Sequence, residues 1–271
     1  MIVLVAIAVA AGVDALLAEG FTIAGDKIKP TRIGAPKSRG CLERVDNQRP
    51  AQQRLQQWFD DHPRWDHASY GEFMHVGANQ TIFRIALQEQ EIGPETRVLD
   101  TACAVGGNAR WMASLYGCQV YGNDIDEEAL SVARDLAKIE NIADLCTFVK
   151  APVDDLPFEN EAFDMVITTD LFDPPEVNRV LRPGGSFIAI SLVEDPKITP
   201  PQLSADWDLD LESSLDVTDL AFAFNKAKEA EARLLHDSDM IGAKELISIM
   251  NESIAPYTRG GRHYIMRLRK P

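Results

Sequence analysis

The sequence predicts an α/β fold in which a doubly wound, seven-stranded and mostly parallel sheet follows an N-terminal extension of helical and irregular segments. Short apolar runs alternate with helical patterns from Arg97 onward, as required where helices cover both faces of a parallel sheet. One of these runs ends in Asp100, directly before a loop of small residues. The 271 residues, 45% hydrophobic and 25% charged, are enough to bury such a core.

The expected elements follow one another in a regular order. Strands are expected at 97–101, 119–123, 146–150, 163–168 and 186–192. A helix through 79–90 precedes them, and Gly93-Pro94 ends it. After them come an acidic, proline-containing insertion at 195–217, a helix at 219–235, and a closing hairpin of strands 245–253 and 263–270 around 257–261. A helix through 246–252 is the alternative for the first arm of this hairpin.

The first 49 residues are expected to form an apolar segment and a basic linker, separate from a domain at 50–271. Residues 1–13 carry no charge, and Glu43 is the only acid among the basic residues of 27–44. A membrane anchor needs about 20 apolar residues, so this run is marginal, and basic flanks stay on the cytoplasmic side. We expect a cytoplasmic or organelle-interior protein, with residues 1–20 contacting a membrane or a protein complex. A helix packed on the domain is the alternative.

The strongest functional signal is RVLDTACAVGGNARWMA, residues 97–113, in which a strand, a loop of small residues and a helix start follow one another. The small residues are Ala102, Ala104, Gly106 and Gly107. They let a ligand lie against the backbone, and the helix start offers free N–H groups. Asp100 would repel a pyrophosphate but suits a ligand with ammonium and sulfonium groups. Asp100 therefore disfavours an NAD-dependent oxidoreductase, which uses a similar loop to bind a pyrophosphate.

Four motifs in this order resemble those of the class I S-adenosylmethionine-dependent methyltransferases that act on small molecules. They are RVLDTACAVGG at 97–107, QVYGND at 119–124, APVDDLPFENEAFD at 151–164 and LRPGG at 181–185. The resemblance is close over about residues 79–192 and looser over 263–270. It implies a Rossmann-like sheet and S-adenosylmethionine as the cofactor.

The resemblance also implies which residues bind the cofactor. Asp124, at the end of the second strand, is expected to accept both ribose hydroxyls, as in dinucleotide folds, and Ile125 to stack on the adenine. The other expected cofactor-binding residues are Asp100, Ala102, Gly106, Gly107, Val153 and Asp154. Pro152 stands where many relatives have the acid that accepts from the adenine amine, so that bond is missing or supplied by Asp154.

The methyl acceptor should lie beyond the carboxyl ends of the strands. Asp170, at the end of the fourth strand, is therefore a candidate base or acceptor ligand, and a turn or cap acid is the alternative. Tyr70, Phe73 and His75, in YGEFMHVG, precede the helix before the first motif and are expected to line the acceptor pocket. His75 is the second catalytic candidate, and Phe172 is a further candidate for substrate contact.

Asp173-Pro174-Pro175 resembles the D-P-P-aromatic motif of amino-group methyltransferases, but Glu176 stands in place of the aromatic residue. Prolines that start a short helix explain the run equally well.

Charge and cysteine spacing exclude other classes. The net charge of −15 argues against a nucleic-acid partner, and the four cysteines lack C-x-x-C spacing, so no metal site is expected. The predicted function is methyl transfer to an N, O or C atom of a small molecule. The alternative is a non-catalytic methyltransferase-fold subunit of a larger assembly, membrane-bound or not. Four features favour that alternative: Pro152, Ala104, the apolar N-terminus and the short segment 170–180, which leaves little room for a helix.

Overall fold

The computed structural model describes residues 21–24, 27–30, 80–237, 251–252 and 254–271. The chain separates into two compact units, Met1–Glu43 and Arg44–Pro271. The described part of the first unit is one antiparallel pair of strands, β1 (Phe21–Ala24) and β2 (Lys27–Pro30). The division predicted between residues 49 and 50 stays a prediction.

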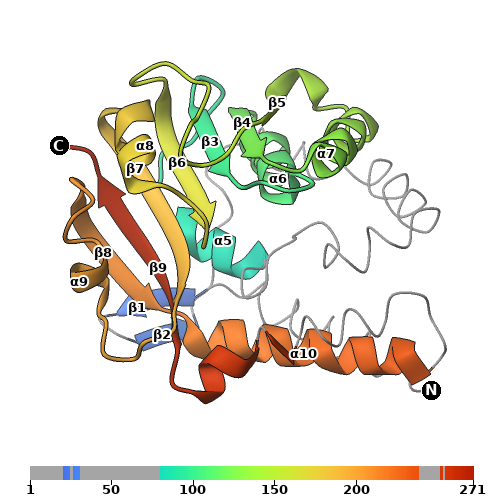
Figure 1. The fold of residues 1–271 in the computed structure, drawn as a ribbon, viewed down its shortest axis with the longest axis vertical. Helices are drawn as coiled ribbons and strands as arrows, with labels where there is room; N and C mark the ends of the chain where they lie inside the picture. Colours follow the sequence, from blue (N-terminus) through green and yellow to red (C-terminus); the bar gives the residue numbers. More distant parts are fainter. Residues whose placement is uncertain (1–20, 25–26, 31–79, 238–250, 253) are drawn as a thin grey trace. The chain divides into compact units, whose positions relative to one another are not determined.

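The second unit contains a seven-stranded sheet in the order β5-β4-β3-β6-β7-β9-β8 (Figure 1). Its strands are β3 (Arg97–Thr101), β4 (Gln119–Asp124), β5 (Cys146–Lys150), β6 (Phe163–Thr169), β7 (Leu181–Val193), β8 (Asp210–Asp216) and β9 (Arg262–Arg269). β9 runs antiparallel to its neighbours β7 and β8, and the other neighbouring pairs are parallel. This confirms the predicted mostly parallel sheet.

The helices of this unit are α5 (Gln80–Leu87), α6 (Gly107–Tyr116), α7 (Glu127–Ile139), the short 3-10 helix η1 (Ala143–Leu145), α8 (Pro174–Val180), α9 (Pro200–Leu203) and α10 (Thr218–Asp237). Local sequence explains their ends. Asp126 accepts from the backbone N–H groups of Glu128 and Ala129 and so caps α7. Gly117, in the left-handed conformation, ends α6.

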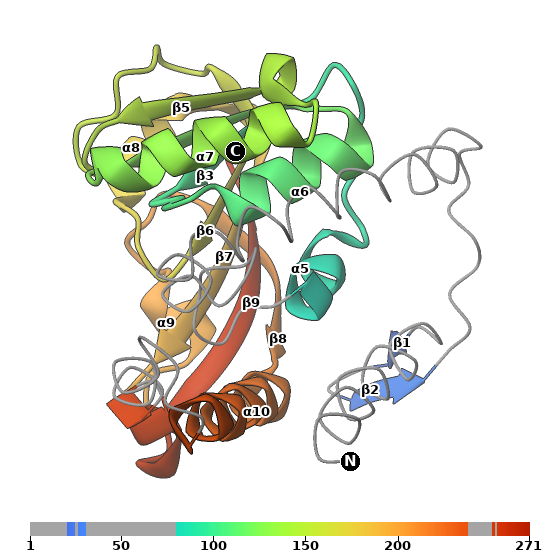
Figure 2. The ribbon, with the colours of Figure 1, turned by 90° about the vertical axis from the view of Figure 1, so that its right-hand side faces the viewer.

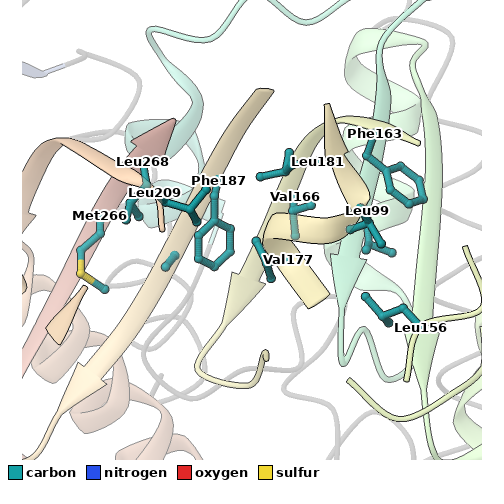
Figure 3. Packing of buried hydrophobic residues seen from close by; sticks show 12 residues of the cluster. Leu99, Leu156, Phe163, Val166, Val177, Leu181, Phe187, Leu209, Met266 and Leu268 are labelled. Carbon is teal, nitrogen blue, oxygen red and sulfur yellow. The ribbon is translucent and has the colours of Figure 1, made fainter. Parts of the chain in front are cut away.

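The strand register divides the sheet into two faces. Leu99, Val166 and Phe187 are partners on neighbouring strands, and they pack in one buried cluster with Val177 and Val180 of α8 (Figure 3). We call this side the α8 face. Asp100 lies on the opposite side with the partner positions Gly122 and Phe148, and we call that side the α6 face.

Three expectations about the elements were wrong. The segment 170–180 is long enough for a helix, because α8 starts directly at Pro174. The expected insertion contains strand β8, whose residues are mostly exposed and polar because it lies at the sheet edge. The closing hairpin is absent from the described residues: 251–252 and 254–258 are helical, and β9 pairs with β7 and β8.

The described ends of the connection between β8 and β9 lie at the carboxyl edge of the sheet. β8 ends at this edge and β9 begins there, because the two strands are antiparallel. Figures 1 and 2 both place α10 beyond the carboxyl ends of β6 and β7. The described residues that follow β8 and precede β9, 217–237 and 254–261, therefore start and end on the side on which ligands bind in open α/β sheets.

Candidate cofactor and acceptor site

Asp100 is a buried acid at the end of β3. Its side chain lies on the α6 face, the residue is 1% exposed, and its Oδ2 has no hydrogen-bond partner among the described residues. Burial raises the pKa of this carboxyl to about 8, the backbone N–H of Ala109 opposes the shift, and the negative charge of Asp124 adds to it. A cationic group would complete the environment of this acid.

The loop after β3 keeps a tight shape although two of its expected glycines are alanine. Ala102 and Ala104 have φ angles of 51° and 48°, and Gly106 has 67°. The loop is closed by the Cys103 N–H, which donates to the Asn123 carbonyl oxygen at 2.9 Å. The left-handed conformation costs about 1–2 kcal/mol at a non-glycine residue. The contacts around the loop offset this conformational free energy and keep Ala102 and Ala104 in the left-handed conformation.

Asp124 joins the loop to the turn after β4. Its Oδ2 accepts from the Ala104 N–H at 2.8 Å, and its Oδ1 accepts from the Asp126 N–H at 2.9 Å. The next side chain, Ile125, is 67% exposed. Because β3 and β4 are parallel neighbours, Asp100 and Asp124 lie at the same edge of the sheet. The structure thus brings together the first two motifs of the predicted site.

Gly106 is required by the packing of the protein itself. A Cβ atom at this position would lie 2.5 Å from Cε1 of Phe148 and 3.2 Å from Cβ of Ala133. The sequence predicts that a side chain at Gly106 would occupy ligand space or force an unfavourable backbone. The contact with Phe148 adds an obstruction within the protein, between this loop and β5.

The third motif forms the loop that contains Val153, which is half-buried, and Asp154, which is exposed. Arg179 of α8 donates to the carbonyl oxygens of Leu156 and Phe158 at 3.0 and 2.7 Å. Glu176 accepts from the Leu156 N–H at 2.8 Å. The hydrogen bond from Arg179 holds the pKa of the Glu176 carboxyl below its usual value.

The Asp173-Pro174-Pro175 run starts α8, as the alternative interpretation held. Asp173 caps the helix by accepting from the Glu176 N–H at 3.0 Å. The structure adds a role that the sequence did not suggest. Glu176 and Arg179 hold the third motif against α8, and only the folded chain brings these segments together.

The candidates on the acceptor side have different surroundings. Asp170 has a φ of 67° and accepts from the Leu192 N–H, which connects the end of β6 to β7. Phe172 packs against Phe187 and Trp207, with ring centroids 5.0 Å apart in both pairs, and belongs to the cluster of the α8 face. This packing gives no support to substrate contact by Phe172. Tyr70, Phe73 and His75 lie outside the described residues.

Sequence reasoning missed a polar pair at the start of β9. The Tyr257 hydroxyl lies 2.9 Å from Nδ1 of His263, and His263 is buried. The sequence pattern predicts a hairpin turn at Tyr257. A tyrosine and a histidine six positions apart carry no motif, so only the tertiary structure reveals the pair.

The described residues contain no group of three or more His, Cys, Asp or Glu side chains that could hold a metal ion. Within the same ranges, no helix is long and apolar enough to cross a membrane.

Comparison with known proteins gives related sequences. Residues 98–185 match a family model described as a methyltransferase domain. The sarcosine/dimethylglycine N-methyltransferase of Halorhodospira halochloris is 31% identical over 138 residues, which is 44% of this chain and 50% of that protein. The glycine/sarcosine/dimethylglycine N-methyltransferase of Actinopolyspora halophila is 33% identical over 125 residues, 43% of this chain and 22% of that protein. The matches span half or less of these relatives' length.

Solved structures share the fold. A protein of Galdieria sulphuraria assigned as a sarcosine dimethylglycine methyltransferase has a TM-score of 0.65 at 16% identity, over 78% of this chain and 98% of that one. A geranyl diphosphate methyltransferase in complex with S-adenosylmethionine has a TM-score of 0.53 at 17% identity, over 69% and 84%. At such identities the likeness shows the fold alone.

The fold, the order of the motifs and the relatives resemble those of class I S-adenosylmethionine-dependent methyltransferases. Residues 98–185 carry the methyltransferase domain, and S-adenosylmethionine is the cofactor of the class.

Proposed function

We propose that this protein transfers a methyl group from S-adenosylmethionine to a small-molecule acceptor. The observation that carries this proposal is buried Asp100, whose Oδ2 has no hydrogen-bond partner in the described part of the chain, directly before the left-handed loop that Asp124 holds. When bound, the cofactor supplies an electrophilic methyl group on a sulfonium centre. The protein contributes mainly by holding donor and acceptor in reactive geometry.

Each cofactor-binding residue has a role that its surroundings allow. Asp100 would pair with the ammonium group, which offsets the cost of a buried carboxylate. Asp124 would accept the ribose hydroxyls. Each of its oxygens already accepts one backbone N–H, and a carboxylate oxygen has room for a second donor. Exposed Ile125 would contact the adenine, with Val153 and Asp154 on the adenine side.

We infer that the acceptor is an amine. The acceptor end of the sheet carries the acid Asp170 and the phenol of Tyr257, groups that suit a cationic, N–H-bearing molecule. The two relatives described above are named as N-methyltransferases that act on glycine derivatives. An amine needs only to lose its proton before it attacks a methyl group, so no strong general base is required.

Two features that favoured a non-catalytic subunit now have an explanation in the fold. The segment 170–180 does form α8, and Ala104 holds the left-handed conformation that a glycine would supply. Pro152 and the apolar run 1–13 are the features that still support the non-catalytic alternative. Failure to bind S-adenosylmethionine would establish that alternative.

Calorimetric titration with S-adenosylmethionine tests the cofactor site. Asp124→Ala should weaken binding tens-fold to hundreds-fold, about 2–4 kcal/mol, because the ribose loses charge-assisted hydrogen bonds. Asp126→Ala is the matched control: it removes the cap of α7, lowers stability by about 1 kcal/mol, and should leave affinity unchanged. Equal affinity of Asp124→Ala and the parent would contradict the assignment.

Formation of S-adenosylhomocysteine in the presence of sarcosine or dimethylglycine tests the acceptor class. Transfer to at least one of these amines is expected. A protein that binds the cofactor and methylates neither amine would show that the acceptor belongs to another class.

A further inference from the structure

Three polar residues, Asp100, Thr169 and His263, lie on the α6 face at the carboxyl edge. Asp100 of β3, Thr169 of β6 and Leu192 of β7 lie on this face, because register partners share a face and residues two apart on a strand do too. Leu192 pairs with His263 of β9, which therefore lies on the same face. The strand register thus places His263 on the same face and at the same edge of the sheet as Asp100, the acid expected to bind the cofactor.

Tyr257 is held over this position by buried polar groups. Its ring lies nearly parallel to that of His263, at an interplanar angle of 18°, with the hydroxyl 2.9 Å from Nδ1. Buried Asn225 of α10 also hydrogen-bonds the phenol. Burial raises the pKa of Tyr257, the negative charge of Asp170 adds to the shift, and the Asn225 hydrogen bond opposes it. The phenol therefore stays protonated near neutral pH.

The phenol oxygen has one hydrogen-bonding position that no described residue fills. A tyrosine hydroxyl has one proton to donate and two lone pairs that accept. The contacts with His263 and Asn225 account for two of these three positions. Thr169, on the same face, has a buried Oγ1 without a hydrogen-bond partner among the described residues. Both hydroxyls are thus able to bind a polar ligand at this end of the sheet.

Building on the proposed methyl transfer to an amine, we infer that Tyr257 binds the acceptor and that His263 is the positioning residue that holds it. An N–H of the acceptor donates to the third position of the Tyr257 oxygen. The nearby charge of Asp170 favours an acceptor that arrives as a cation. Buried His263 fixes the direction of the phenol without contacting the acceptor.

The first test is Tyr257→Phe, assayed with sarcosine and dimethylglycine. Loss of one hydrogen bond to the acceptor should raise KM for the amine about tenfold. Affinity for S-adenosylmethionine should stay within about twofold of the parent. Tyr264→Phe is the matched control, because Tyr264 pairs with Ser191 and packs against the cluster of the opposite, α8 face. The control should change neither quantity.

The second test separates positioning from a merely structural role. His263→Asn places an acceptor oxygen near the former Nδ1 and should restore most of the parent KM, whereas His263→Leu should behave like Tyr257→Phe. A structural role alone would lower the unfolding temperature of both variants and leave the amine KM of the folded protein unchanged, which would overturn the positioning role.

The remaining outcomes are also decisive. A Tyr257→Phe protein with the parent's amine KM overturns the inference and leaves the proposed function standing. A parent protein that binds cofactor but methylates neither amine overturns the acceptor class and this inference together. A parent protein that binds no cofactor overturns the proposed function itself.

Discussion

Asp100 couples the stability of the ligand-free protein to pH. Its carboxyl has a pKa of about 8 in the folded protein, against an ordinary value of 3.8. Between these values the folded protein binds more protons than the unfolded chain, so this residue lowers stability as pH rises from about 4 to 8. Below pH 4 and above pH 8 its contribution is constant.

Asp100→Asn should remove this pH dependence. The neutral amide avoids a buried charge, so the variant should exceed the parent in stability at pH 8 and approach it near pH 5. Urea unfolding at a series of pH values measures the difference. Parallel stability curves for the two proteins would show that Asp100 is ionised in the folded state throughout.

The same acid should release a proton when cofactor binds. Near pH 7 the free protein holds Asp100 protonated, and an ammonium partner favours the carboxylate, so the proton leaves. Calorimetry in buffers of different ionisation enthalpy should show about one proton released by the parent protein. Methylthioadenosine, which lacks the amino-acid part, serves as the control ligand and should release none through this residue. Release of a proton by both ligands would contradict pairing with the ammonium.

Alanine substitutions at Gly106 and Gly184 distinguish the stability cost of backbone strain from that of steric overlap. Both have positive φ angles, 67° and 72°, but a Cβ on Gly184 meets nothing within 4 Å. Gly184→Ala should therefore cost about 1 kcal/mol of stability from its conformation alone. Gly106→Ala should cost about 1–3 kcal/mol more, because the new methyl group overlaps Phe148. Equal losses in denaturant unfolding would show that Phe148 moves aside freely.

At the scale of elements, the sequence predicted those segments whose pattern is local. The strands that carry Asp100 and Asp124 were predicted because each combines buried apolar residues with an acid at its carboxyl end. Strand β8 was not predicted from the sequence, because an edge strand with one buried residue, Leu215, lacks an apolar run. The Tyr257–His263 contact could not be predicted, because it depends on the register of β9.

Arg267 connects α5 to the sheet. This buried side chain of β9 donates to the carbonyl oxygens of Ile85 and Ala86 in the last turn of α5, at 2.7 and 3.1 Å, and pairs with Glu89 at 2.9 Å. The carbonyl groups at a helix end have no partner within the helix. Arg267 donates to two of these carbonyl groups and so holds α5 on β9.

Replacing Arg267 should lower the free energy of unfolding much more than replacing Arg269, two positions further along β9. Arg267→Met leaves buried carbonyl oxygens without donors and should lower the free energy of unfolding by about 2–4 kcal/mol. Arg269→Met is the control: Arg269 pairs with exposed Glu212, and such surface pairs contribute about 0–1 kcal/mol. Urea unfolding measures both, and similar losses would mean that the contact with α5 adds no stability.

At the scale of the whole molecule, the chemistry is concentrated in one compact unit. Every described residue assigned to cofactor or acceptor lies within Arg44–Pro271, which contains the entire seven-stranded sheet. The apolar run 1–13 and the basic residues of 27–37 belong to Met1–Glu43. We infer that the first unit determines where the protein resides, by contact with a membrane or a partner protein, and that the second unit performs methyl transfer.

Removal of residues 1–43 tests this division. Because the second unit has its own core and all the proposed cofactor contacts, the truncated protein should bind S-adenosylmethionine within about twofold of the full chain, measured by calorimetry. Sedimentation with vesicles rich in anionic lipid should recover the full chain and leave the truncated protein in the supernatant, since apolar and basic residues act together in membrane binding. If neither protein sediments, the membrane contact is refuted. If the truncated protein unfolds or loses cofactor affinity, the first unit is part of the catalytic fold, and the alternative of a helix packed on the domain is correct.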